Sequence, residues 1–185
     1  MIDKFRASLP SEWVKYVVVL ILSVALWVWA FGMFHAPSDI EKIEVFFAGE
    51  VKNYSFEKDA ADAFDSLKSV QLRAVSPQMG TSFNQKYTMV GLASSDVVIV
   101  PESVAEKTDC ASVFLPLQGF GESFCQGEGE NTVAYGVYLS DAVIARLSPY
   151  FVFEEGRYVV FAVASSVNAG KITDHSIRFI EWLVG

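Results

Sequence analysis

The stretch Tyr16–Phe34, YVVVLILSVALWVWAFGMF, divides the chain into two parts. It has nineteen residues and no charge, and a helix of that length reaches about 28 Å, close to the thickness of the hydrocarbon core of a bilayer. Trp13 and Lys15 precede it and Trp29 lies toward its other end, and such rings and amines favour the level of the lipid headgroups. A buried helix of a soluble protein is the other interpretation, but this helix has no polar face. The sequence therefore predicts a transmembrane helix over residues 16–34.

The charges on either side of this helix predict its orientation. Residues 1–15 contain three basic and two acidic side chains, whereas the chain after the helix is rich in acid. Because positive charge favours the cytoplasmic side, we expect a cytoplasmic tail at 1–15, a short linker at 35–42 and an extracytoplasmic domain at 43–185. This topology is that of a single-pass protein of the cell membrane. A cleaved secretory signal is the alternative, since Ala30 and Gly32 would suit a signal peptidase.

The charge of the outer part limits what it can bind. The whole chain has 185 residues, of which 52% are hydrophobic, and a formal net charge of -8. The residues after position 15 hold eleven basic and twenty acidic side chains, so this part carries a net charge of -9. An acidic domain without a basic stripe is repelled by phosphate backbones, which excludes nucleic acid as a partner. The roughly 150 residues outside the helix and its tail are enough for one hydrophobic core.

Two cysteines, Cys110 and Cys125, both follow the predicted transmembrane helix. Outside the cytoplasm such a pair usually forms a disulfide bond. Closing a loop of this length stabilises a fold by about 3 kcal/mol in the chain-entropy model. Zinc binding is the alternative, but two thiolates without a nearby histidine make a poor zinc site. We therefore predict a disulfide between Cys110 and Cys125, and no metal.

The domain begins with three strand-like segments separated by two amphipathic ones. Ile43–Ala48 (IEVFFA) and Asp96–Val100 (DVVIV) are apolar runs typical of strands covered on both faces, while Val70–Val75 alternates like an edge strand. The two segments between them have apolar faces, at Phe56–Leu67 and Phe83–Val90, and these predict helices. Strand and helix alternating with connections of this length make parallel strands. The expected order is 2-1-3, with the first strand in the middle.

The remaining sequence predicts strands that return to this sheet. Residues 116–131 are rich in Gly and Glu and irregular, and strands are expected at Thr132–Leu139 and Tyr158–Ser165. Ser140 would cap a short helix between them, and a last helix begins near Thr173. Together these elements predict an α/β fold, a single three-layer domain with a mostly parallel sheet, preceded by one transmembrane helix.

This succession of segments resembles a known family. The run IEVFFAG, helix, VQLRAVSP, helix, SDVVIVPES looks like the first lobe of the type 2 periplasmic solute-binding proteins. AYGVYLSD and YVVFAVASSVNAGKITDHSIRFIEWL look like the place where such chains return to that lobe. The interval 101–131 is too short for the family's second lobe, so the resemblance implies a single lobe in a bacterial cell envelope. A single lobe cannot trap a ligand by closure, so solute capture does not follow from the resemblance alone.

An open α/β sheet binds ligands beyond the carboxyl ends of its strands, where the strand order reverses. In this chain that edge is built from small and polar residues that follow the three strands: Gly49, Glu50, Ser76, Gln78, Glu102 and Ser103. Residues of this kind at helix starts could hold an anion, sugar hydroxyls or a peptide. The alternative is that they only form the caps and turns of any α/β domain.

Three phenylalanines, Phe114, Phe120 and Phe124, accompany the predicted disulfide loop. A closed loop would hold these rings near the surface, where an apolar patch marks a protein interface. The alternative is that the rings fill the space left by the absent lobe. A single lobe removes water from only one side of a small ligand, whereas a protein partner can bury a much larger surface. The sequence therefore favours an interaction module that contacts another membrane or cell-surface protein. A tethered domain that captures a small anion, sugar or peptide for a transporter is the second hypothesis.

No catalytic or cofactor site is predicted. The two histidines, His35 and His175, are far apart in the chain, and the sequence has no G-x-S-x-G, H-E-x-x-H or phosphate-binding loop. Since the cysteines are expected to be oxidised, no pair of nucleophile and base can be nominated. We therefore expect no enzyme activity and no cofactor.

Overall fold

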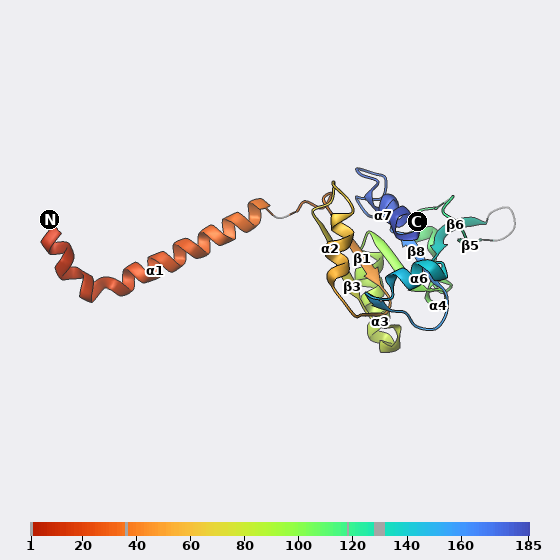
Figure 1. Ribbon diagram of the computed structural model, residues 1–185, viewed down its shortest axis with the longest axis horizontal. Helices are drawn as coiled ribbons and strands as arrows, with labels where there is room; N and C mark the ends of the chain where they lie inside the picture. Colours follow the sequence, from red (N-terminus) through yellow and green to blue (C-terminus); the bar gives the residue numbers. More distant parts are fainter. Residues whose placement is uncertain (1, 36, 118, 128–131) are drawn as a thin grey trace. The chain divides into compact units, whose positions relative to one another are not determined.

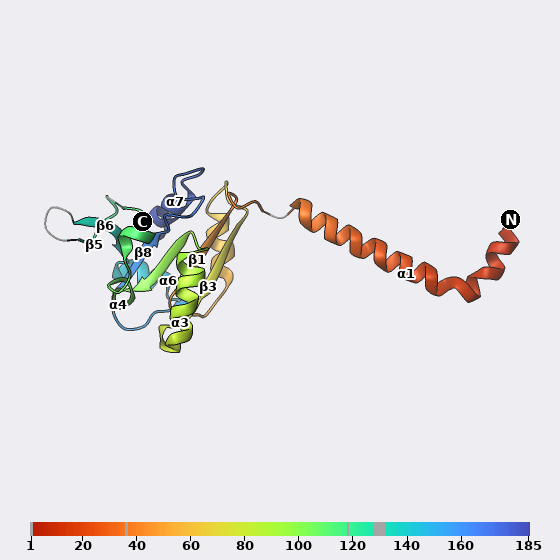
Figure 2. The ribbon, with the colours of Figure 1, turned by 180° about the vertical axis from the view of Figure 1, so that it is seen from behind.

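The computed structural model describes residues 2–35, 37–117, 119–127 and 132–185. They fall into two compact units, Met1–Ala36 and Pro37–Gly185, and Figures 1 and 2 show the chain from opposite sides. Of the segment predicted to be irregular, residues 118 and 128–131 lie outside the described residues.

The first unit is one long helix, α1 (Ile2–His35). Within it, the 21 residues Trp13–Met33 have a mean hydropathy of 2.3. Among the described residues, this is the one helix long and apolar enough to cross a membrane. The predicted apolar helix is therefore confirmed, and it continues back into the predicted tail. Its length and composition suit a membrane span and also an N-terminal signal sequence.

The second unit is built on six strands, which lie side by side in the order β3 (Ser69–Ala74), β1 (Lys42–Phe47), β4 (Val97–Pro101), β8 (Tyr158–Ala162), β6 (Val133–Tyr138) and β5 (Ser123–Gln126). β1 is parallel to both of its neighbours, whereas β8, β6 and β5 pair antiparallel. The sheet is therefore mixed, which corrects the predicted mostly parallel sheet. A small second sheet pairs β2 (Glu50–Val51) with β7 (Phe151–Val152).

The path of the chain explains the antiparallel return. β6 ends at the same edge of the sheet as β1 and β4, because its direction is opposite to that of β8. The chain is still at this edge in β7, which pairs with the strand that follows β1. It then enters β8 from that edge, so β8 has to run against β4.

Alternate side chains of the central strands enter two different hydrophobic cores. In β1, Val45 and Phe47 belong to one core and Phe46 to the other, and the same alternation divides β4 and β8. The first core is covered by α2 (Ser55–Asp62), α6 (Asp141–Leu147) and α7 (His175–Val184), and the second by α3 (Thr81–Lys86), its π-helical continuation η2 (Tyr87–Leu92), α4 (Glu102–Ala105) and α5 (Cys110–Val113). Because both faces are buried, these strands need apolar residues over most of their length, which explains their apolar runs.

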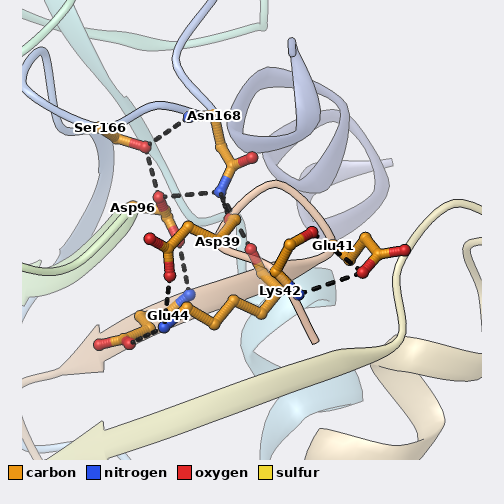
Figure 3. A network of polar contacts seen from close by, with 8 residues as sticks. Asp39, Glu41, Lys42, Glu44, Asp96, Ser166 and Asn168 are labelled. Carbon is orange, nitrogen blue, oxygen red and sulfur yellow. Dashed lines mark hydrogen bonds and ion pairs between the residues drawn. The ribbon is translucent and has the colours of Figure 1, made fainter. Parts of the chain in front are cut away.

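The residues before β1 are fastened to the domain and do not form a free linker. The Asn168 side-chain amide donates to the backbone oxygens of Asp39, at 3.1 Å, and Lys42, at 3.0 Å. The Lys42 ammonium lies 3.0 Å from the Asp39 carboxylate and 3.2 Å from that of Glu44. Figure 3 shows these residues around the buried carboxylate of Asp96. The predicted linker 35–42 is therefore part of the folded domain from about its middle onward.

Asp96 holds the centre of this group of contacts, which we name the linker clasp (Asp39, Lys42, Glu44, Asp96, Ser166 and Asn168; Figure 3). Its carboxylate accepts hydrogen bonds from the Glu44 N–H at 2.7 Å, from the Ser166 hydroxyl and from the Asn168 amide at 3.2 Å. Burial raises the pKa of Asp96, although these three donors act against that shift. The clasp joins the start of β1, the start of β4 and the segment after β8.

The two cysteines are free thiols in this structure, and the predicted disulfide stays a prediction. Side chains alternate along β5, and Gln126 points to α5, where its Oε1 accepts from the Cys110 N–H at 2.8 Å. The neighbouring side chain, Cys125, is exposed, while Cys110 is buried. Burial raises the pKa of the Cys110 thiol to about 11.

We expect the two thiols to react at very different rates. Iodoacetamide should modify Cys125 in the folded protein and spare Cys110, because a buried thiol with a raised pKa forms little thiolate. Both should react after denaturation, and a Cys125→Ser variant should stay unlabelled until it unfolds. Peptide mass spectrometry measures this, and recovery of a cross-linked Cys110–Cys125 peptide would contradict the structure.

A surface ion pair beside the clasp gives a second prediction. Hydrogen bonds from Lys68, at 2.7 Å, and from Ser38 lower the pKa of Glu41 from 4.5 to about 2. A lowered pKa means that the ionised Glu41 stabilises the fold above pH 4.5, and that this contribution disappears as the pH falls toward 2. Glu41→Gln should therefore lower the melting temperature of the full-length protein at neutral pH, and the difference from wild type should shrink in acid.

The Lys68→Met background is the control for this measurement. Without the ammonium, Glu41→Gln should change the melting temperature less at neutral pH. A difference that stays constant from neutral pH to pH 3 would show that the carboxylate charge is not the cause.

Candidate functional site

The carboxyl ends of β1 and β3 border a hollow of about 530 Å³. It contains four of the six residues that the sequence predicts to bind a ligand: Gly49, Glu50, Ser76 and Gln78. Tyr54 and Met79 also line it, and their side chains are 64% and 52% exposed. Neither residue belongs to a periodic apolar pattern, so neither was predicted from the sequence.

Local backbone geometry brings these residues together. At Gly49 a Cβ atom would lie 2.5 Å from the Phe47 ring and 2.8 Å from the Val152 oxygen, so only glycine fits where β1 passes into β2. On the other side of the hollow, Ser76 precedes a short 3-10 helix, η1 (Pro77–Met79), and its hydroxyl caps that helix by accepting from the Gln78 N–H at 3.3 Å. The hollow is therefore bordered by two tight turns, each fixed by a specific residue.

The other two predicted ligand residues lie apart from this hollow. Glu102 accepts a hydrogen bond from the Tyr138 hydroxyl and lines a separate, smaller hollow with Ser103 and Arg157. The Arg157 guanidinium lies 3.5 Å from the centre of the Tyr138 ring and 2.6 Å from the Glu122 carboxylate. Burial, together with the bond to Glu102, raises the pKa of Tyr138 to about 12. Glu102 is therefore already engaged by this chain.

A segment of the chain itself separates the two groups. Residues 154–158 make hydrogen bonds at the carboxyl end of each parallel strand, and we name them the crossing segment. The Ser76 hydroxyl, after β3, donates to the Glu154 carboxylate at 3.1 Å. The Tyr158 hydroxyl donates to the Ala48 oxygen, after β1, at 3.2 Å. The Glu102 N–H, after β4, donates to the Arg157 oxygen at 2.9 Å. The crevice where strand order reverses is thus filled by protein.

Aromatic packing holds the crossing segment against the sheet. Tyr158 is fully buried, and its hydroxyl accepts from the Glu154 N–H at 2.9 Å. The ring of Phe153 meets the Tyr158 ring edge-on with centroids 4.9 Å apart, and Phe47 contacts both rings. Burial raises the pKa of Tyr158, so its hydroxyl keeps the proton that it donates.

The predicted partner-contact phenylalanines do not form an exposed patch. Phe114 stacks on Phe161 of β8 with centroids 4.3 Å apart, and Phe124 meets the same ring edge-on at 5.6 Å. Both are buried in the second core, and Phe120 is half-buried against the first. The prediction that these rings face a partner is therefore wrong for Phe114 and Phe124. The reason is that both rings pack on Phe161 of β8, which buries them.

A second hollow, of about 550 Å³, lies between α3–η2 and α4–α5. Its lining is mixed: hydroxyl and amide groups of Asn84, Thr88, Ser103 and Ser112, charges of Lys107 and Asp109, and the edges of Phe83, Tyr87 and Val104. The buried Tyr87 hydroxyl pairs with the Thr108 hydroxyl at 3.0 Å. Burial raises the pKa of Tyr87 to about 12. A π-helical turn such as η2 is common beside functional sites, and no sequence signal pointed to it.

Within the described part of the chain, no three His, Cys, Asp or Glu side chains come close enough to hold a metal ion. Comparison with protein-family models, with curated proteins and with solved structures finds no match for this chain. The resemblance to solute-binding proteins therefore stays a hypothesis.

Removing the Tyr158 hydroxyl tests whether the crossing segment is held in place by the hydrogen bonds of this group. Tyr158→Phe keeps the ring but leaves the Glu154 N–H and the Ala48 oxygen without this partner, so we expect the free energy of unfolding to fall by about 1–3 kcal/mol. Tyr150→Phe is the matched control, because that hydroxyl donates to Asp59 at the surface, at 2.9 Å. Denaturant unfolding of the full-length protein in detergent gives both values. Equal values for the two variants would show that the crossing segment does not depend on this bond.

Proposed function

We propose that this protein is a single-pass membrane protein whose acidic domain lies outside the cytoplasm and binds a protein partner. The helix of membrane-spanning length and the charges around it support the topology. The position of the crossing segment is the observation that supports a protein partner over a small solute. Because residues 154–158 separate the predicted ligand residues into two groups, a small solute cannot contact all of them in one site at the strand ends.

The surface we assign to the partner is the hollow between β1 and β3 with Tyr54 and Met79 beside it. Tyrosine and methionine are enriched in the centres of protein interfaces, and a partially open hollow accepts a side chain of the partner. Glu50, Gln78 and Lys86 in the lining offer both signs of charge and an amide for polar contacts around that side chain. The expected partner is a membrane or cell-surface protein that presents an apolar side chain.

A tethered solute-binding domain is the second candidate, and it rests on the hollow between α3–η2 and α4–α5. A volume of about 550 Å³ lies within the usual range for small-ligand sites. Its hydroxyl, amide and charged groups would suit a sugar or an amino acid more than an apolar molecule.

Paired substitutions separate the two candidates. With an affinity tag after residue 185 and gentle detergent extraction, wild type should co-purify with a stoichiometric membrane partner, and the double variant Tyr54→Ser, Met79→Ser should lose it. Met89→Ser is the matched control, because Met89 is 74% exposed but lies on η2, outside this hollow. It should retain the partner.

Two outcomes would contradict the proposal. Recovery of the same partner with all three proteins would place the interface elsewhere. Recovery of a lone monomer whose melting temperature rises with a sugar, an amino acid or an oxyanion, and no longer rises after Asn84→Ala, would favour the solute-binding candidate.

A further inference from the structure

A second group of exposed apolar side chains lies at the opposite end of the sheet. Ile40, Val167 and Ile172 are 39%, 37% and 68% exposed, and we name them the Ile172 patch. Ile40 precedes β1, and Val167 follows β8, whose end lies at this edge because β8 runs against β4. In Figures 1 and 2 the blue segment before α7 lies beside the start of β1 in both views.

Hydrogen bonds hold this patch together. The Asn168 amide reaches the Asp39 oxygen, which brings the residue after Val167 against the residue before Ile40. The Ile172 N–H donates to the Val167 oxygen at 3.4 Å. Asn168 itself is 1% exposed, so the donor side of this part-buried bond is shielded from water.

The loop that carries Ile172 is a tight turn. The Gly170 N–H donates to the Thr173 oxygen at 2.7 Å, and the Thr173 hydroxyl donates to the Asn168 side chain at 2.7 Å. Gly170 has φ +81°, a conformation that favours glycine. Ile172 is therefore held outward at the tip of an ordered turn, with the exposed Lys171 next to it. An apolar side chain flanked by a lysine is suited to the boundary between water and lipid.

Chain connectivity identifies what covers this patch. Met33 is the last residue of the stretch that can cross a membrane, and Ser38 already bonds to the domain through Glu41. Five residues of extended chain reach at most about 18 Å. If α1 is a membrane anchor, as the proposed function holds, Ile40 cannot be far from the lipid headgroups.

The charged groups near the patch nearly balance. Lys42 is paired with both Asp39 and Glu44, Lys68 is paired with Glu41, and the exposed Lys171 and Asp174 lie on either side of Ile172 in the chain. These pairs reduce the repulsion that lone carboxylates would meet at an anionic lipid surface.

We propose that the Ile172 patch inserts into the interfacial layer of the bilayer to which the protein is anchored. This inference rests on the proposed membrane anchoring and adds a lipid-binding surface to it. The hollow with Tyr54 and Met79, at the carboxyl ends of the strands, then remains in the aqueous phase and open to a partner.

Position-specific fluorescence tests the proposal with the full-length protein in liposomes of phosphatidylcholine and phosphatidylglycerol. Ile172→Cys and Tyr54→Cys are each made in a Cys125→Ser background and labelled with an environment-sensitive dye, while Cys110 stays protected by burial. The two parent side chains have similar exposed fractions, 68% and 64%. We expect nitroxide lipids to quench the dye at 172 several-fold more than at 54, and aqueous iodide to quench it several-fold less. Val167→Cys should follow Ile172→Cys.

Different results would contradict different parts of the proposal. Equal iodide quenching at 172 and 54, in protein that resists alkaline carbonate extraction, would overturn the lipid-binding surface and leave the anchor intact. Release by carbonate would overturn the anchor and, with it, this inference. Shielding of position 172 in native membranes but not in pure lipid would assign the patch to a neighbouring protein.

Discussion

The structure of the domain depends on burying both faces of β1, β4 and β8. Each of these strands sends alternate side chains into two separate cores, so Val45 and Phe47 pack under α2, α6 and α7 while Phe46 packs under α3 and η2. A strand in this position has no solvated face, so most of its residues are apolar. The polar residues of β1, Lys42 and Glu44, lie toward its start, where its burial is incomplete. Groups that could bind a partner are consequently concentrated at the ends of the strands and on the helices.

At each end of the sheet, one buried polar group joins neighbouring segments by hydrogen bonds. At the amino end of β4, the Asp96 carboxylate collects three donors from the start of β1 and from the segment after β8. At the other end, the Tyr158 hydroxyl both donates to Ala48 and accepts from Glu154. A buried polar group without partners costs folding free energy, so each of these groups fixes the segments that satisfy it. The Asp96 carboxylate fixes the residues around the start of β1, and the Tyr158 hydroxyl fixes the crossing segment.

The sequence was informative where burial alone decides the structure. The runs IEVFF and VVIV predicted the central strands because they are short, apolar and rich in β-branched and aromatic residues. The sequence was not informative where the structure depends on contacts between residues that are far apart in the chain. Glu154, Gly156 and Arg157 look like an ordinary polar turn, and nothing local says that they cross the ends of three strands. The same holds for Phe114 and Phe124, whose surroundings are set by Phe161.

The crossing segment limits what this α/β domain can bind at its strand ends. A two-lobed receptor uses an open strand edge and a hinge, and ligand affinity comes from closing one lobe on the other. In this chain Ser76, Ala48 and Glu102, which would face that ligand, are bonded to residues 154–158 instead. Opening the crevice would expose the Phe47, Phe153 and Tyr158 rings and leave the Ala48 oxygen unpaired, a cost that a small ligand touching one face could hardly repay. The exposed surfaces that remain for binding include those around Tyr54 and Ile172, at opposite ends of the sheet, and the hollow between α3–η2 and α4–α5.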